Sequence, residues 1–240
     1  MSTPREDADV ETSSEGYARR FAGPVGRFFL DCQAEATLDL LRPFPGASVL
    51  DVGGGHAQVT GPLVAAGHPV TVLGSDASCE ARVREWTQAG RARFVAGDLL
   101  APPVPERSYD VVLSYRLLPH VRRWPELVAV LSRLSRVAVV VDYPTRRSVN
   151  AAAELFFGLK KGVEGNTRPF TVFSHDEVER AFAAHGFRPT GRRPQFFFPM
   201  ALHRALRSAG LARGLEGAAS GLGLTRVLGS PVILRLERHG

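Results

Sequence analysis

Short runs of apolar and β-branched residues recur along the chain, separated by polar stretches and turn residues. Runs of this kind predict β-strands. The run Val137–Val141 is almost wholly apolar, which is typical of a central parallel strand covered on both faces. The first five predicted strands are residues 48–52, 69–75, 92–96, 109–114 and 137–141.

Segments with helical spacing and helix-boundary residues fall between these strands. From Val25 to about Leu41 the apolar residues follow helical spacing, and Pro43 and Pro45 end the pattern. A second helix is expected to begin near Ala57, with Pro62 near its first turn or at a kink. Further helices are predicted from Ser78 to about Ala89, from Pro125 through Leu134, and from the capping box Ser174–Glu177 to Gly186.

The alternation of strands and helices indicates the fold class. It predicts an α/β protein with a doubly wound, mostly parallel sheet and helices on both faces, joined by right-handed crossovers. Two later strands are expected at Phe187–Phe198, which two prolines interrupt, and at Pro231–Leu236.

Two segments and one terminus do not fit a minimal sheet. Residues 1–14 are rich in Ser, Thr, Asp and Glu and are expected to form a disordered tail, so that a single domain spans residues 15–240. Inserts at about 144–173 and 199–229 are helix-compatible and rich in Phe, Leu and Arg. We expect them to cap a ligand crevice at the carboxyl edge of the sheet; the alternative is peripheral packing.

The net charge and its distribution along the chain bear on whether the protein binds nucleic acid. The formal net charge is +6, but arginine supplies almost all of the positive charge, and lysine occurs only at Lys160 and Lys161. The arginines are scattered rather than gathered in a run, so we do not expect a nucleic-acid partner.

The two cysteines, Cys32 and Cys79, have no CxxC partner, so neither a metal site nor a disulfide framework is indicated. The N-terminal residues contain no apolar signal-peptide core, and no apolar run approaches the roughly 18 residues that span a bilayer. A cytoplasmic protein is therefore expected.

Candidate chemistry lies where the predicted strands end. Asp51 ends the first strand and is followed by the glycines 53–55, whose freedom at positive φ lets a backbone turn approach a ligand closely. Asp76 ends the second strand about 20 residues later, the spacing of a carboxylate that binds ribose hydroxyls. Asp98 follows the third strand. Each aspartate alone is explained equally well by a turn or a helix cap, but three at one sheet edge, beside a glycine turn, indicate a nucleotide-like ligand.

These residues resemble the class I S-adenosylmethionine-dependent methyltransferases. The resemblance runs from about Tyr17 to Phe187 and is carried by residues 49–55, 76–78, 97–100 and 109–114. It implies a Rossmann-like sheet of seven strands with an antiparallel last strand, and S-adenosylmethionine as the cofactor. One departure is Ala57 in place of a third motif glycine.

The resemblance also implies roles for individual residues. Gly53 and Gly55 would pass close to the methionine part of the cofactor, and Asp51 would help to hold its ammonium group. Asp76 would bind the ribose and Asp98 the adenine amino group. The other residues implied at the cofactor are Tyr17, Arg20, Gly54, His56, Ala77, Leu99 and Ser114.

A nicotinamide dinucleotide is the alternative cofactor. Its fingerprint requires a glycine where this chain has Gln58, and Asp51 would repel a pyrophosphate. Methyl transfer is therefore favoured over hydride transfer.

The acceptor and the catalytic groups are less well specified. His120, Asp142 and Tyr143 are candidates for a base that removes a proton from a hydroxyl nucleophile. Candidates for acceptor binding are Arg116, Asn166, Arg168 and Phe197. The alternatives are loop packing for His120, a solvated surface loop for Asn166 and Arg168, and sheet core for Phe197. We expect methyl transfer to a small, partly apolar acceptor at a hydroxyl or carbon; the alternatives are an RNA or protein methyltransferase and a non-catalytic cofactor-binding protein.

Overall fold

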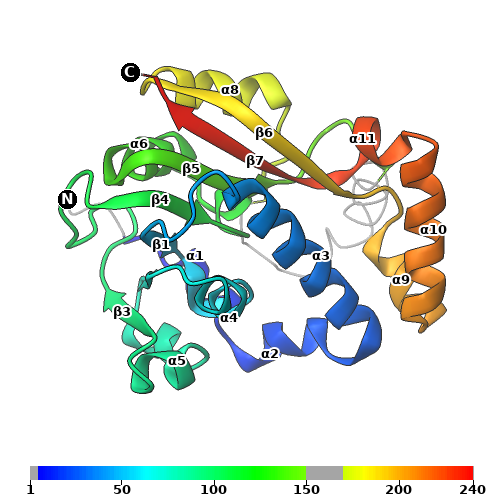
Figure 1. Cartoon of the computed structure of the whole chain (residues 1–240), viewed down its shortest axis with the longest axis horizontal. Coiled ribbons are helices and arrows are strands. Elements are labelled where there is room, and N and C mark those ends of the chain that lie inside the picture. The colour runs from blue at the N-terminus through cyan, green and yellow to red at the C-terminus, as the bar shows by residue number, and fades with distance from the viewer. Residues whose placement is uncertain (1–4, 150–169, 240) are drawn as a thin grey trace.

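A computed structural model describes residues 5–149 and 170–239 and contains a seven-stranded sheet of order β3-β2-β1-β4-β5-β7-β6 (Figure 1). Strands β1 to β5 pair in parallel, and β7 lies antiparallel between β5 and β6. This confirms the predicted Rossmann-like fold with an antiparallel last strand. The strands are β1 (Val49–Val52), β2 (Val70–Gly74), β3 (Ala92–Ala96), β4 (Tyr109–Ser114), β5 (Ser135–Tyr143), β6 (Phe187–Phe196) and β7 (Ser230–Arg238).

The helices cover both faces of the sheet and one end of it. The α-helices are α1 (Ala8–Thr12), α2 (Glu15–Ala18), α3 (Gly23–Leu41), α4 (Thr60–Ala65), α5 (Arg84–Gln88), α6 (Trp124–Leu134), α8 (His175–Ala183), α9 (Met200–Leu206), α10 (Ala209–Gly221) and α11 (Leu224–Leu228). The short 3-10 helices in the described part of the chain are η1 (Arg19–Phe21), η2 (Gly54–His56), η3 (Ala77–Glu80) and η4 (Leu118–His120). Among the described residues, no helix combines the length and the apolar character needed to cross a membrane.

Alternate residues of the central strands build two separate cores. On β1, Val49 packs with α3 and α4 on one face of the sheet, whereas Leu50 and Val52 pack with α6 and α8 on the other. Successive side chains of a strand point to opposite faces, so an almost wholly apolar strand is the consequence of covering both.

The first helices after β1 and β2 are shorter than the sequence predicts. After β1 the chain forms η2, and Ala57 follows with a left-handed φ of 60°, so α4 begins only at Thr60. Pro62 then lies within the first turn of α4, where its missing N–H costs no helical hydrogen bond. The predicted helix after Ser78 is divided into η3 and α5.

The expectation that residues 1–14 form a disordered tail is wrong for the part that the structure describes. Asp9, Thr12 and Ser13 are buried; the first two lie in α1, and Ser13 follows it directly as the C-cap. The Asp9 carboxylate accepts a hydrogen bond from the backbone N–H of Ser75 at 2.8 Å. A polar segment is ordered here because its side chains satisfy backbone groups at the edge of the sheet.

The insert at 199–229 forms α9, α10 and α11, which gather beyond the end of α3 (Figure 1). An apolar cluster with Phe28 and Phe29 of α3, Phe196 of β6 and Ala212 of α10 joins them to the domain. We call α9–α11 the cap. Residues 150–169 of the other predicted insert lie outside the described residues.

Candidate active site

The loop after β1 packs the backbone of its glycines against the carboxyl group of Asp51. Gly53 has a φ of 75°, a conformation that glycine adopts without strain. A Cβ at Gly54 would lie 2.2 Å from the Asp51 carboxyl group, so only glycine leaves room for that carboxyl. The predicted motif therefore forms a tight turn packed around Asp51.

Asp51 is a buried acid without a counter-charge in contact. It is fully buried, and neither carboxylate oxygen has a hydrogen-bond partner among the described residues. Burial, with a smaller contribution from Asp142, raises its pKa to about 7. An unpaired buried carboxylate is costly, so this position favours either a proton or a bound cation.

His56 is held in its neutral form. Its Nδ1 atom accepts the backbone N–H of Gln58 at 3.1 Å, which leaves the ring proton on Nε2. Burial, followed by the positive charge of Arg116, lowers the His56 pKa to about 3. A neutral buried imidazole shapes the turn and carries no charge at neutral pH.

Asp76, Ala77 and Asp98 line one open hollow of about 540 Å³, as their strand-end positions predict. Asp76 is exposed and caps η3, since its Oδ1 accepts the N–H of Ser78 at 2.8 Å; hydrogen bonds from Ser78 lower its pKa. Asp98 accepts the N–H of Leu100 at 2.9 Å. Both aspartates thus use an oxygen for a local turn and still border the hollow.

Two other predicted cofactor residues point elsewhere. Leu99 is fully buried in the core beneath α6. The Ser114 hydroxyl donates to the carbonyl of Val52 at 3.1 Å and so ties β4 to β1.

Helix α1 lies against the glycine loop. If Gly53 carried a Cβ, that atom would lie 3.5 Å from the Cβ of Asp9. A Cβ on Gly55 would lie 2.3 Å from Ser13 Oγ. Arg5 donates to the carbonyl of Ser75 in the same hollow as Asp76. The N-terminal segment therefore contacts the same loop that the sequence assigns to a cofactor.

A second cavity, of about 320 Å³, lies under the cap at the carboxyl ends of β4 and β5. It brings together four residues that the sequence singled out, Tyr17, Arg116, His120 and Asp142. The other lining residues are Pro119, Pro144, Phe170, Pro199, Met200, Ala201, Arg204, Ser230 and Pro231. We call this space the acceptor cavity.

Arg116 is fixed at the floor of the acceptor cavity. Its backbone N–H donates to Asp142 Oδ1 at 2.6 Å, and its guanidinium donates to Gln58 Oε1 at 2.8 Å and Gln33 Oε1 at 3.1 Å. The guanidinium also stacks on the Phe21 ring at 4.6 Å. Burial raises the pKa of Asp142, and the charge of Arg116 opposes that effect.

Several predicted site residues are not in this cavity. Tyr143 follows Asp142 on β5 and so faces the opposite side of the sheet, where its hydroxyl lies 2.8 Å from His175 Nδ1 in the core under α8. Phe197 packs on Phe198, and its N–H donates to Glu216. Arg20 is exposed, paired with Glu11 at 3.4 Å and stacked on the Tyr17 ring. Asn166 and Arg168 lie outside the described residues.

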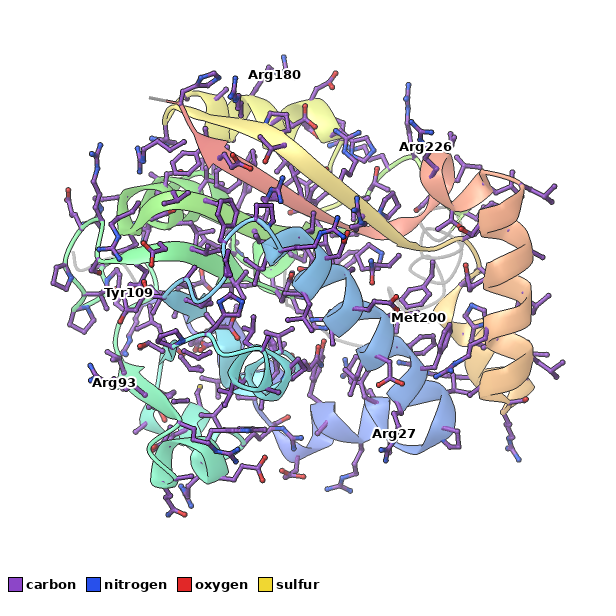
Figure 2. The ribbon with its side chains drawn as sticks, viewed as in Figure 1. Arg27, Arg93, Tyr109, Arg180, Met200 and Arg226 are labelled. Carbon is purple, nitrogen blue, oxygen red and sulfur yellow. The ribbon has the colours of Figure 1, made fainter. Side chains whose placement is uncertain are left out.

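Sequence reasoning missed Asp9 of α1 and the cap residues Met200 and Arg204. Asp9 is one of several acidic residues in a polar segment, and Arg204 is one of four arginines in the insert. No local pattern distinguishes these positions, because tertiary packing selects them. In Figure 2, Met200 of α9 lies between α3 and α10, where it packs against the apolar cluster.

The sequence is similar to those of known methyltransferases. The ubiquinone biosynthesis O-methyltransferase of Rhizobium etli is 25% identical over 169 residues, covering 66% of this chain and 67% of that protein. The malonyl-[acyl-carrier protein] O-methyltransferase of Pectobacterium atrosepticum is 26% identical over 207 residues, covering 85% and 80%.

The fold is shared with magnesium protoporphyrin IX methyltransferase from Synechocystis PCC 6803, solved with bound S-adenosylhomocysteine. The TM-score is 0.67 at 15% identity, and the match covers 96% of this chain and 98% of that one. A family model described as "Methyltransferase domain" matches residues 27–213. The chain thus belongs to the methyltransferase-domain family and is an S-adenosylmethionine-dependent methyltransferase.

Proposed function

We propose that this enzyme methylates a small, partly apolar molecule at a hydroxyl or carbon nucleophile. The observation that carries the proposal is the acceptor cavity, which joins polar groups at the sheet edge to an apolar wall from the cap. Its volume of about 320 Å³ suits a small molecule. Among the relatives, the names of the ubiquinone and malonyl-carrier enzymes specify O-methylation.

The residues at the ends of β1, β2 and β3 fit the cofactor. S-adenosylmethionine is cationic at its ammonium and sulfonium groups, and the unpartnered carboxylate of Asp51 suits a cation. Asp76 and Asp98 border one hollow and offer oxygen acceptors for the hydroxyls and the amino group of adenosine. We therefore assign Asp51 and the glycine loop to the methionine part, and Asp76 with Ala77 and Asp98 to adenosine.

The chain's own task is to orient the acceptor and remove a proton. The cofactor supplies the electrophilic methyl group, so positioning carries much of the catalysis. We assign acceptor deprotonation to His120, whose ring lines the cavity and contacts Phe170 at 5.5 Å between ring centroids. Asp142 lines the same cavity and, through the backbone N–H of Arg116, holds the loop after β4 in place.

The test is to incubate the enzyme with methyl-labelled S-adenosylmethionine and separate fractions of small metabolites, RNA and protein. Label in a small molecule, identified by mass spectrometry, is the expected result. Label confined to RNA or protein would overturn the proposal. For a hydroxyl acceptor, His120→Ala should lower kcat by about 10²–10⁴-fold, while His185→Ala, which removes a histidine outside the acceptor cavity, should retain activity.

A further inference from the structure

The acceptor cavity has an unbalanced charge. Its apolar wall includes Phe170 and Met200, yet two guanidinium groups, those of Arg116 and Arg204, also line it. The one carboxylate among its described lining residues is Asp142, which already accepts the backbone N–H of Arg116 at 2.6 Å. The cavity is thus apolar with an excess of positive charge.

Arg204 lacks a carboxylate partner among the described residues. Its guanidinium donates to the backbone carbonyl of Arg20 at 3.3 Å, a neutral acceptor. Arginines nearby are paired differently: Arg20 with Glu11 at 3.4 Å and Arg213 with Asp31 at 3.4 Å. Arg204 therefore keeps donors and a full charge for a ligand.

The second guanidinium adds to the positive potential without competing for the ligand. The hydrogen bonds of the Arg116 guanidinium go to the neutral acceptors Gln58, Gln33 and Tyr17, so no carboxylate contacts its charge among the described side chains. Burial, and then the positive charges of Arg20 and Arg116, lower the pKa of Arg204. An anion bound between the cap and the sheet edge would relieve this repulsion.

We propose that the methyl acceptor is an apolar acid whose anionic oxyacid group is bound by Arg204. This inference rests on the proposed function and names the substrate class of the same site. Arg204 acts as a specificity residue: its planar fork of donors matches the paired oxygens of a carboxylate or phosphate. The apolar wall around Met200 and Phe170 takes the body of the molecule.

Arg204 belongs to the cap, so the choice of acceptor depends on a different element from the one that carries the reacting groups. Arg204 is on α9, whereas Asp142 is on β5 and His120 follows β4. The acid-binding group and the groups beside the reacting atom thus belong to different elements. Removing Arg204 should change which acceptors bind and leave cofactor binding unaffected.

The experiment uses the full-length enzyme saturated with S-adenosylhomocysteine and measures binding by calorimetry at about 0.15 M salt. The probes are matched pairs: 4-phenylbutyrate against 4-phenylbutyramide, and phenyl phosphate against phenol. At least one acid should bind about tenfold or more tightly than its neutral partner, since charge-assisted hydrogen bonds contribute that much. The two acids distinguish a carboxylate acceptor from a phosphate acceptor.

Arg204→Gln should abolish the preference for the acid and leave the affinity of the neutral probe within about twofold. The matched control is Arg226→Gln, which removes the same charge from α11; Arg226 is exposed and projects at the outer end of the cap (Figure 2). The control variant should keep the preference.

Three outcomes would overturn the proposal: no acid binds more tightly than its neutral partner, Arg204→Gln keeps the preference, or Arg226→Gln loses it equally. The proposed function is tested separately from acid binding, because its test measures the transfer of labelled methyl groups. Label found only in RNA or protein would reject a small acceptor even if Arg204 still bound acids.

Discussion

At the scale of single residues, burial shifts the pKa values of two side chains in the glycine turn, Asp51 and His56. Asp51 is fully buried with unpartnered oxygens, and its pKa is raised to about 7. Its neighbour in the turn, His56, is neutral, with a pKa lowered to about 3. Among these two groups, only Asp51 changes its charge near neutral pH.

Cofactor affinity should therefore depend on pH through Asp51. A bound cation favours the ionised carboxylate, so below a pKa of about 7 binding must release a proton. The affinity for S-adenosylhomocysteine should rise by up to about tenfold per pH unit between roughly pH 5 and 7 and level off above that range. Calorimetry in buffers of different ionisation enthalpy measures the released proton directly. Asp51→Asn should remove the release of the proton. An equal release from this variant would assign the proton to another group, such as Asp142, whose charge acts on Asp51.

Ala57 offers a test of backbone strain at the same turn. It occupies a left-handed φ of 60°, which costs an L-residue about 1–2 kcal/mol. Ala57→Gly should raise the free energy of unfolding by about 0.5–1 kcal/mol, after allowing for the greater freedom of glycine in the unfolded chain. Chemical denaturation measures it. The control Ala34→Gly, in the interior of α3, should instead lower stability by about 1 kcal/mol.

At the scale of elements, α1 contacts the glycine loop that we assign to the cofactor. Asp9 binds the N–H of Ser75 at 2.8 Å and contacts Cys79 Sγ at 3.6 Å. Ser13 lies against Gly55. The resemblance assigns this loop to the methionine part of the cofactor, so we expect binding to displace α1 from it.

Weakening the contacts of α1 should then strengthen cofactor binding. Asp9→Ala removes the acceptor for Ser75 N–H and should lower the Kd for S-adenosylhomocysteine about three- to tenfold, the equivalent of one hydrogen bond. Asp7→Ala is the control, because Asp7 is exposed and its side chain makes no capping hydrogen bond to α1. A higher Kd for Asp9→Ala would show that α1 keeps its place in the bound state.

The elements also show what the sequence could predict. Strand positions followed from local apolar runs, and the aspartates at their ends followed from parallel pairing, which brings those ends to one edge. Helix α1 could not be predicted, because five residues form a helix only when tertiary contacts such as that of Asp9 hold them. Tyr143 was misplaced because it was assigned to the same space as Asp142, although adjacent strand residues face opposite sides.

At the scale of the whole molecule, the two binding regions draw on different parts of the chain. The residues assigned to the cofactor lie between Asp51 and Asp98, close in sequence. The acceptor cavity joins Tyr17 of α2 to Arg204 of α9 and Pro231 of β7. The second region depends on how the cap docks, which local sequence patterns do not report.

The docking of the cap depends on Glu216 of α10. Its oxygens accept the N–H groups of Phe197 at 2.9 Å and Phe198 at 3.0 Å, and Oε1 lies 2.7 Å from His203 Nε2. His203 is fully buried among the aromatic rings of Phe28, Phe29 and Phe196. One carboxylate thus joins α10 to α9 and to the end of β6.

Glu216→Ala should detach the cap while leaving the cofactor region intact. Loss of its partners leaves buried donors unpaired and should lower the free energy of unfolding by about 2–4 kcal/mol. Hydrogen exchange should then increase in α9 and α10, and the KM for the acceptor should rise because Met200 and Arg204 leave the cavity wall. The Kd for S-adenosylhomocysteine should stay within about twofold, since none of the residues assigned to the cofactor is on the cap. Glu216→Gln keeps one acceptor oxygen and should give a smaller effect. A large loss of cofactor affinity, matching the loss of acceptor binding, would show instead that the cap and the cofactor region act as one unit.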